Sequence, residues 1–391
     1  MTSREPPERP RPVRVEAIHV RVPFRRPLLD ATGEYTHRRS WLLRVAGEDG
    51  RQGLGEAALN PFADETTTSA LAALMREIVP ALAAGREVDL VDLAGEGEAG
   101  RAATAALEGA LASLPVVGPA GPLPGTPGRP PEPIPVAAAI GFGGPDAGAD
   151  AAAQAVELGF GTLALRAGFE RTTDQLVDRL RAIRAAIGPE PRLRVDVGGA
   201  WDLATATERL LAIEPFRVEF VAQPLAAGEL AGHAALRGRT GIRIALDDDV
   251  ASVGSARAAL AEGAAEVLVV KPARVGGLAA TLRIAEAAAA SGARVVLGTY
   301  FETGVGIAAV LRVAAALRAS GLGRSGVDSP VPGAPSGGEV AHHVATAGVL
   351  AHDLLSLPLP IRGGMMAVPA AVALDESEID RYALERVEAN R

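Results

Sequence analysis

From residue 136 to residue 297 the chain repeats one pattern, a short apolar run followed by an Ala-rich stretch with helical periodicity. The apolar runs lie at 136–140, 162–166, 193–196, 218–221, 242–246, 267–270 and 295–297. From the second run onward they end near 166, 196, 222, 247, 271 and 298, so successive ends are 24–30 residues apart. That spacing is one strand–loop–helix unit, and such units in series predict parallel strands joined by right-handed crossovers.

The length of the repeat favours a closed barrel over an open sheet, since a (β/α) barrel needs about 250 residues. We therefore expect a (β/α)7β TIM-like barrel over residues 133–354, with an eighth strand near 326–329. The residues before it read as a separate unit. Strands are expected at 13–23, 40–46 and 53–59, with helices at 67–84 and 102–114.

A Pro- and Gly-rich linker at 115–135 separates the two units, and the tail after residue 354 carries no further repeat. The fold class predicted is thus α/β, a barrel with an α+β capping domain. The cap is formed by residues 1–132 and completed by the C-terminal tail, about 355–391.

Composition excludes several classes of function. The chain lacks cysteine, which removes disulfides, thiolate nucleophiles and Cys-ligated metals. A net charge of −8 argues against a nucleic-acid partner, and the sequence lacks an apolar run of the roughly 18 residues needed to cross a membrane. The N-terminus lacks the apolar region of a signal peptide, so the expectation is a cytoplasmic protein, and we expect a homo-oligomer.

One basic residue stands apart from the others. The chain has 39 Lys and Arg residues, and 38 of them are arginine; the single lysine is Lys271, directly after the apolar run 267–270. A lysine pKa shifts readily on burial, so this amine is a candidate acid or base. The competing interpretation is an ordinary surface charge.

Polar residues gather at the ends of the expected strands, where a (β/α) barrel carries its active site. They are Arg166, Asp196, the segments 222–224 and 247–249, Lys271 and, after strand seven, Glu302. Asp196 and Asp247 are oxygen donors of the kind that bind Mg²⁺. Each of these aspartates could instead cap a helix, and 247–249 could be a solvated turn. His342, His343 and His352 could bind a metal, but exposed or helix-capping roles are expected.

Five ordered motifs resemble the enolase superfamily in its muconate-lactonizing branch, and most of all o-succinylbenzoate synthase and N-acylamino-acid racemase. They are VDVGGAWD at 195–202, EFVAQPL at 219–225, ALDDDV at 245–250, KPARVGGL at 271–278 and FETGVG at 301–306. In the expected cap, GLGE at 53–56 and ALEGAL at 106–111 add to the resemblance.

The resemblance implies removal of a proton α to a carboxylate, with Mg²⁺ stabilising the enediolate and lysines acting as acid and base. It implies metal ligands at Asp196, Asp247 and, in part, Asp248, and catalytic roles for Lys271 and Arg166. Gly298, Thr299 and Glu302 after strand seven, and Tyr35 in a specificity loop at 28–39, would contact a small carboxylate substrate. A plain surface hairpin is the alternative for that loop.

The sequence also departs from the family pattern at several of these positions. Ala222 replaces the second metal-binding carboxylate, and the Lys-x-Lys pair on strand two is replaced by Ala164 and Arg166. Gly198 stands where the family has Asn, and Asp248 where it has Glu. An arginine has a pKa above about 12 and does not readily act as a base, so Lys271 remains as the family's acid–base group.

Three hypotheses follow from this combination. The first is an enzyme of the o-succinylbenzoate synthase type, a carbon–oxygen lyase of menaquinone synthesis, or a related N-acylamino-acid racemase or dipeptide epimerase. The second is a repurposed enzyme that uses Lys271 without the usual Mg²⁺ site. The third is a non-catalytic relative that binds a small carboxylate or a partner protein.

Overall fold

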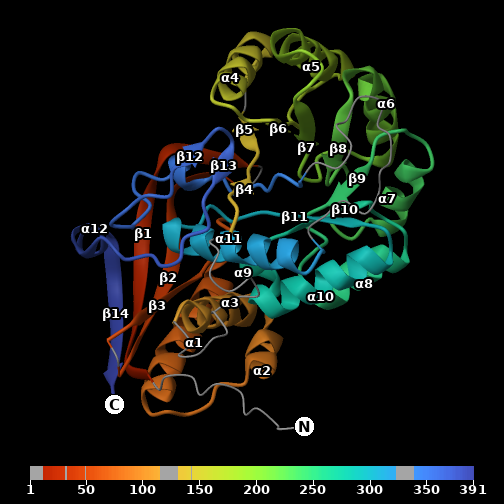
Figure 1. The fold of residues 1–391 in the computed structure, drawn as a ribbon. Coiled ribbons are helices and arrows are strands. Elements are labelled where there is room, and N and C mark those ends of the chain that lie inside the picture. Colours follow the sequence, from red (N-terminus) through yellow and green to blue (C-terminus); the bar gives the residue numbers. More distant parts are fainter. Residues whose placement is uncertain (1–11, 31–32, 49, 115–130, 142, 323–338) are drawn as a thin grey trace.

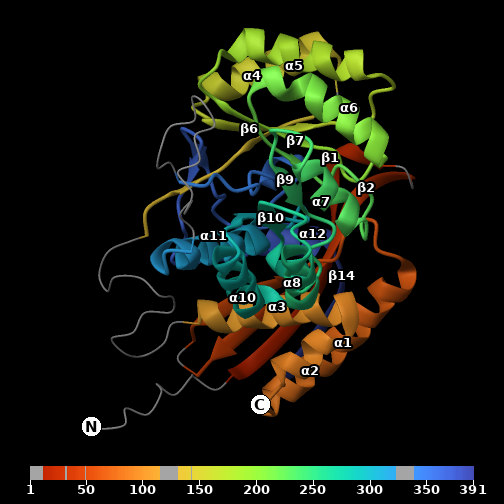
Figure 2. The ribbon, with the colours of Figure 1, turned by 90° about the vertical axis from the view of Figure 1, so that its right-hand side faces the viewer.

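The computed structural model describes residues 12–30, 33–48, 50–114, 131–141, 143–322 and 339–391. Two parts make up the molecule, an antiparallel sheet with its helices and a curled parallel sheet surrounded by helices (Figures 1 and 2). This is the α/β architecture predicted from the repeat. The domain boundaries at 132 and 354 stay a prediction.

The antiparallel part is a four-stranded sheet in the order β14-β1-β2-β3, with helices packed on one face. The chain ends in this sheet, where β14 lies beside β1 (Figure 1). Its alternating apolar residues divide between the helices on one side and the barrel on the other. The elements are β1 (Pro12–Asp30), β2 (Gly33–Gly47), β3 (Gln52–Ala57), α1 (Glu65–Ala83), α2 (Leu90–Gly95), α3 (Gly97–Ser113), α12 (Glu376–Tyr382) and β14 (Ala383–Asn390).

The parallel part has seven strands in sequence order, from β5 to β11. They are β5 (Ala138–Ile140), β6 (Thr162–Arg166), β7 (Arg192–Asp196), β8 (Val218–Ala222), β9 (Ile244–Leu246), β10 (Val267–Val270) and β11 (Arg294–Leu297). These strands match the seven apolar runs to within two residues at either end, so the repeat predicted them correctly.

Helices join these strands and cover the outside of the barrel (Figure 1). They are α4 (Pro145–Glu157), α5 (Thr173–Ile187), α6 (Leu203–Ile213), α7 (Leu230–Arg237), α8 (Val253–Ala261), α9 (Pro272–Val275), α10 (Gly277–Ala290) and α11 (Gly304–Ala319). Short elements complete the chain: β4 (Ile134–Pro135), β12 (Ile361–Arg362), β13 (Met365–Met366), η1 (Glu214–Phe216) and η2 (Ala347–Val349). In the described part of the chain, no helix combines the length and apolarity needed to span a membrane.

Strand alternation decides which side chains enter the barrel. Leu165 and Val195 point outward, where they pack among buried residues beneath the helices. Successive strand residues face opposite sides, so Arg166 and Asp196 point inward. The interior itself is a small apolar cluster that includes Phe220, Ala222, Ala245, Val267, Val269 and Val296. Above this apolar cluster, at the carboxyl ends of the strands, the inward-facing side chains are polar, and this end is the mouth of the barrel.

The barrel closes through residues 342–343. His342 forms a parallel bridge with Val136, and His343 forms one with Gly298 beyond β11. The eighth strand expected at 326–329 lies outside the described residues. In the described part of the chain, residues 342–343 bridge the first and last strand regions of the barrel. The expectation that these histidines are exposed is wrong for His342, which is 5% exposed and accepts a hydrogen bond from the Leu297 N–H at 3.0 Å.

A buried carboxylate joins the cap to the barrel. Glu56, the penultimate residue of β3, is 4% exposed, and its Oε2 accepts hydrogen bonds from Thr303 Oγ1 at 2.6 Å and from the Gly306 N–H at 3.0 Å. Thr303 is the N-cap of α11, so Glu56 meets N–H groups that the helix cannot satisfy itself. Negative charge at this end is also favoured by the helix dipole.

Acidic pH should weaken the closure of the barrel. Burial, with Arg194 nearby, lowers the pKa of His342 to about 3, so the folded protein holds this imidazole neutral. The unfolded chain takes up the proton near pH 6.5, and stability is therefore lost as the pH falls below that value. Between pH 7 and pH 5 we expect His342 to cost about 2 kcal/mol of unfolding free energy.

Urea unfolding of the wild type and of a His342→Asn variant at pH 7 and pH 5 measures this loss of unfolding free energy. Asn can accept the same Leu297 hydrogen bond but does not titrate, so the variant should lose less stability than the wild type over that interval. Equal losses in the two proteins would contradict the buried neutral histidine.

Candidate active site

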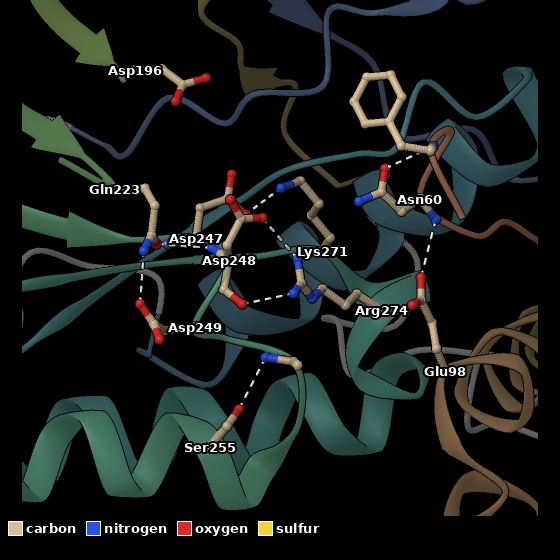
Figure 3. Close-up of polar contacts among 12 residues, drawn as sticks. Asn60, Glu98, Asp196, Gln223, Asp247, Asp248, Asp249, Ser255, Lys271 and Arg274 are labelled. Carbon is tan, nitrogen blue, oxygen red and sulfur yellow. Dashed lines mark hydrogen bonds and ion pairs between the residues drawn. The ribbon is translucent and has the colours of Figure 1, made fainter. Parts of the chain in front are cut away.

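Four of the predicted site residues meet at the mouth of the barrel, where β6, β7, β9 and β10 end. Arg166 and Asp196 are the last residues of β6 and β7 and are direct neighbours in the sheet. Asp247 follows β9 and Lys271 follows β10. Figure 3 shows Asp247, Lys271 and the neighbouring aspartates. The sequence thus placed these residues correctly; their chemical roles stay predictions.

The lone lysine is largely enclosed in this mouth. Its Nζ donates a hydrogen bond to Asp247, and its side chain is 13% exposed, so it is not a surface charge. The ring of Tyr300 lies 5.1 Å from the same Nζ, within the range of a cation–π interaction. A Cβ at Gly298 would be 3.4 Å from the Lys271 Cγ, so this glycine leaves the lysine stem its room.

Asp247 is held in a low-dielectric position. Burial raises its pKa, the Lys271 ammonium lowers it, and the carboxylates of Asp248 and Asp196 raise it again, with a net upward shift. Asp196 and Asp247 are not helix caps here, since Asp202 and Ser252 cap the helices that follow β7 and β9. The capping interpretation is therefore wrong for both aspartates.

Arg166 forms an ion pair with Asp196. The Nη1 donates to Asp196 Oδ2 at 2.7 Å, and the two side chains are 38% and 37% exposed. Although burial lowers the pKa of Arg166, the Asp196 carboxylate raises it beyond its usual value, so the guanidinium stays charged. This arginine acts as a fixed cation at the end of β6.

Gln223 organises the three consecutive aspartates. It is fully buried, its Oε1 accepts the N–H groups of Asp247 and Asp248 at 3.0 Å, and its Nε2 donates to Asp249 at 2.8 Å (Figure 3). Asp249 also accepts the Gly228 N–H at 2.7 Å. The segment 247–249 is therefore a fixed loop and not the solvated turn that was the alternative.

Two residues of the site were missed by sequence reasoning, Arg274 and Tyr300. Arg274 binds Asp248 through Nη1 at 3.1 Å and through Nη2 at 2.7 Å to the backbone oxygen. It follows Lys271 by three residues, one turn of α9, and helical spacing could have indicated it. Tyr300 is one of three tyrosines in the chain and is 5% exposed.

The residues expected to contact the substrate differ in how far they are buried. Thr299 is 8% exposed and shares a hydrogen bond with Thr346 at 2.9 Å. Tyr35 belongs to the β1–β2 hairpin, the form that was the alternative for the loop at 28–39, and its ring centroid lies 4.4 Å from that of Phe62. Phe24 of the same hairpin contacts Phe301, so the hairpin reaches the loop after β11. Substrate contact by these residues stays a prediction.

Glu302 lies beneath the cap rather than open to the mouth. It is 1% exposed, and its Oε2 accepts the Tyr300 N–H at 2.5 Å. Burial and the nearby Glu56 raise the pKa of Glu302 to about 7, while Arg38 opposes that shift. A direct role in substrate binding is therefore less favoured for Glu302 than a role in cap–barrel docking.

A divalent cation does not fit the residues gathered here. Ala222, the last residue of β8, offers no side-chain oxygen at the position where the resemblance implies a carboxylate, and the two flanking carboxylates already pair with cations. Across the described ranges, no cluster of three or more His, Asp or Glu side chains could hold a metal. Mg²⁺ dehydrates reluctantly and usually binds through one or two free carboxylates, whereas Asp196 and Asp247 would each first have to release a cationic side chain.

Residues 147–376, more than half of the chain, match the family model described as enolase C-terminal domain-like. The chain belongs to the enolase superfamily. Members of this superfamily are lyases and isomerases, and they typically bind Mg²⁺. The match agrees with the resemblance read from the five motifs.

Curated relatives resemble shorter stretches of this enolase-superfamily chain. It is 38% identical to an o-succinylbenzoate synthase of Thermobifida fusca over 110 residues, 28% of this chain and 34% of that protein. It is 37% identical to an N-succinylamino acid racemase of Thermus thermophilus over 105 residues, 27% of this chain and 28% of that protein. The matched parts thus span about a third of these relatives.

Solved structures agree in fold along almost the whole chain. A Listeria innocua member of the enolase superfamily superposes with a TM-score of 0.78 at 22% identity, covering 97% of this chain and 99% of that one. A muconate lactonizing enzyme of Pseudomonas fluorescens, complexed with muconolactone, gives 0.77 at 23% identity, covering 96% and 100%. At such identities the likeness establishes the fold alone.

Replacing Glu302 with Gln should change how stability depends on pH. A carboxyl whose folded pKa is about 7 and whose unfolded pKa is 4.5 stabilises the fold below pH 4.5, and this stability is lost as the pH rises through 7. Between pH 5 and pH 8 the wild type should lose about 2–3 kcal/mol more than Glu302→Gln.

Chemical unfolding at both pH values tests this, with Glu262→Gln as an exposed control. The control should follow the wild type. Parallel stability curves for wild type and Glu302→Gln would contradict the raised pKa.

Proposed function

We propose that this chain is an enzyme of the o-succinylbenzoate synthase type, a carbon–oxygen lyase that dehydrates a small hydroxy-carboxylate in menaquinone synthesis. The observation that carries the proposal is the position of Lys271, the one lysine of the chain, enclosed at the barrel mouth. A syn-dehydration needs one acid–base group on one face of the substrate. Racemisation and epimerisation by a lysine pair need two, and Arg166 replaces the second.

The proposed reaction balances with this single group. Lys271 first passes one ammonium proton to the adjacent Asp247 carboxylate. Its neutral amine then removes the proton α to the substrate carboxylate, and the electron pair moves into the carboxylate to form an enediolate. The pair then returns, the carbon–oxygen bond to the β-hydroxyl breaks, and the Lys271 ammonium donates its proton to the departing oxygen. The products are an alkene and water, and Lys271 is restored.

The surrounding cations support this proposal. An enediolate carries extra negative charge, which fixed positive groups stabilise when they are already in place before the reaction. Arg166 stays charged beside Asp196, and Arg274 lies one helical turn from Lys271. Gln223 and the paired aspartates hold these groups in position, so little reorganisation is needed.

A second candidate is a relative that binds a small carboxylate without turning it over. The observation that favours it is the Arg166–Asp196 ion pair. Arg166 stands where the resemblance implies a lysine, and it is bonded to Asp196, which the resemblance implies as a metal ligand. A guanidinium is well suited to bind a carboxylate but poorly suited to exchange protons with it.

Formation of o-succinylbenzoate from its hydroxylated precursor distinguishes the two candidates. The proposal expects turnover by the wild type and a loss of about 10³-fold in Lys271→Met, because the proposed acid–base group is removed. Asp178→Asn, in an exposed pair on α5, is the control and should keep full activity.

Binding of o-succinylbenzoate without turnover of the precursor would favour the second candidate. Full activity in Lys271→Met would overturn the assignment of this residue. Solvent deuterium exchange into an N-succinylamino acid, followed by NMR, would detect an isomerase instead.

A further inference from the structure

The two family ligands that remain are both occupied by side chains of the protein. Arg166 bonds to Asp196 at 2.7 Å, and Lys271 bonds to Asp247. Between their strands, Ala222 ends β8 with a methyl group that packs into the apolar interior. A cation at this position would therefore lack a carboxylate at residue 222. It could bind Asp196 and Asp247 only after Arg166 and Lys271 had released them.

Arg166 and Gly198 are sterically coupled. A Cβ at Gly198 would lie 2.3 Å from the Arg166 Nη2 and 2.7 Å from its Nη1, closer than atoms can approach. The φ of +62° at Gly198 is one that Asn also adopts, so the backbone alone does not demand glycine. It is the guanidinium that fills the space of a side chain at 198.

Charge balance at the mouth points the same way. Arg166, Lys271 and Arg274 face Asp196, Asp247 and Asp248 in three ion pairs, so each of these three carboxylates is balanced by a cation, while Asp249 beside them accepts hydrogen bonds from Gln223 and Gly228. Mg²⁺ dehydrates reluctantly, and carboxylates that are already paired with a cation attract it only weakly. A site that attracts a divalent cation needs an excess of carboxylates.

We infer that the Arg166 guanidinium has taken the place of the divalent cation, and that this enolase-superfamily chain works at its barrel mouth without a metal. Asp196 uses one of the five N–H donors of Arg166, and the side chain remains 38% exposed. The other donors suit a planar carboxylate, the bidentate partner of arginine. This inference does not depend on the dehydration proposed above.

Binding of the metal alone provides the test. Wild-type protein is compared with the variant Arg166→Lys, Gly198→Asn, Ala222→Glu, which empties the guanidinium space and restores the third carboxylate. Isothermal calorimetry with Mg²⁺ and with Mn²⁺ measures binding, and thermal unfolding in about 10 mM MgCl₂ or in EDTA measures the linked stability.

The expected result is no heat of binding and no shift in Tm for the wild type. The triple variant should bind both metals and gain several degrees in Tm, and adding Asp196→Asn should abolish that gain. Circular dichroism confirms that each variant is folded; if the triple variant does not fold, Gly198→Asn alone should displace the guanidinium and begin to admit Mn²⁺.

Mg²⁺ binding by the wild type that is lost in Asp196→Asn would overturn the inference. So would a folded triple variant that binds neither metal, because Arg166, Gly198 and Ala222 would then not be what excludes the cation. These outcomes are separate from turnover: a metal-binding wild type that makes o-succinylbenzoate keeps the proposed function and removes this inference. A wild type that neither binds Mg²⁺ nor makes o-succinylbenzoate keeps this inference and removes the proposed function.

Discussion

The contact between Glu56 and the start of α11 is the interaction on which the arrangement of cap and barrel depends. One buried carboxylate from the cap sheet accepts N–H and hydroxyl donors at the beginning of a barrel helix. Removing the carboxylate would leave those donors buried without an acceptor, which typically costs about 1–3 kcal/mol for each group. The same contact fixes the loop after β11, and with it Tyr300 beside Lys271.

The seven barrel strands could be predicted because a repeating unit of 24–30 residues constrains topology as well as secondary structure. Strand ends in a parallel barrel share one rim, so the sequence also predicted that Arg166, Asp196, Asp247 and Lys271 would meet. Chain closure could not be predicted in the same way. Residues 342–343 form two isolated bridges and carry no apolar run that would mark a strand.

Pairings between residues of the site were beyond the sequence for a different reason. The sequence does not distinguish the three adjacent aspartates. In the structure Gln223 binds the backbone of Asp247 and Asp248 and the side chain of Asp249, and the three carboxylates bind Lys271, Arg274 and Gln223 respectively. Gln223 itself adopts a φ of +45°, a conformation that side chains rarely take and that local propensity does not predict. Ion-pair partners therefore emerged only from the three-dimensional arrangement.

The close approach of Arg166 to Gly198 also restricts the order in which such a site can change. A side chain at 198 meets the Arg166 guanidinium, which is the far end of a flexible side chain and must move when residue 198 carries a Cβ. The two positions are thus epistatic, and the effect of either substitution depends on the other. A side chain introduced at 198 therefore acts at a distance from its own position, because it moves the guanidinium away from Asp196 and changes which charge that carboxylate faces.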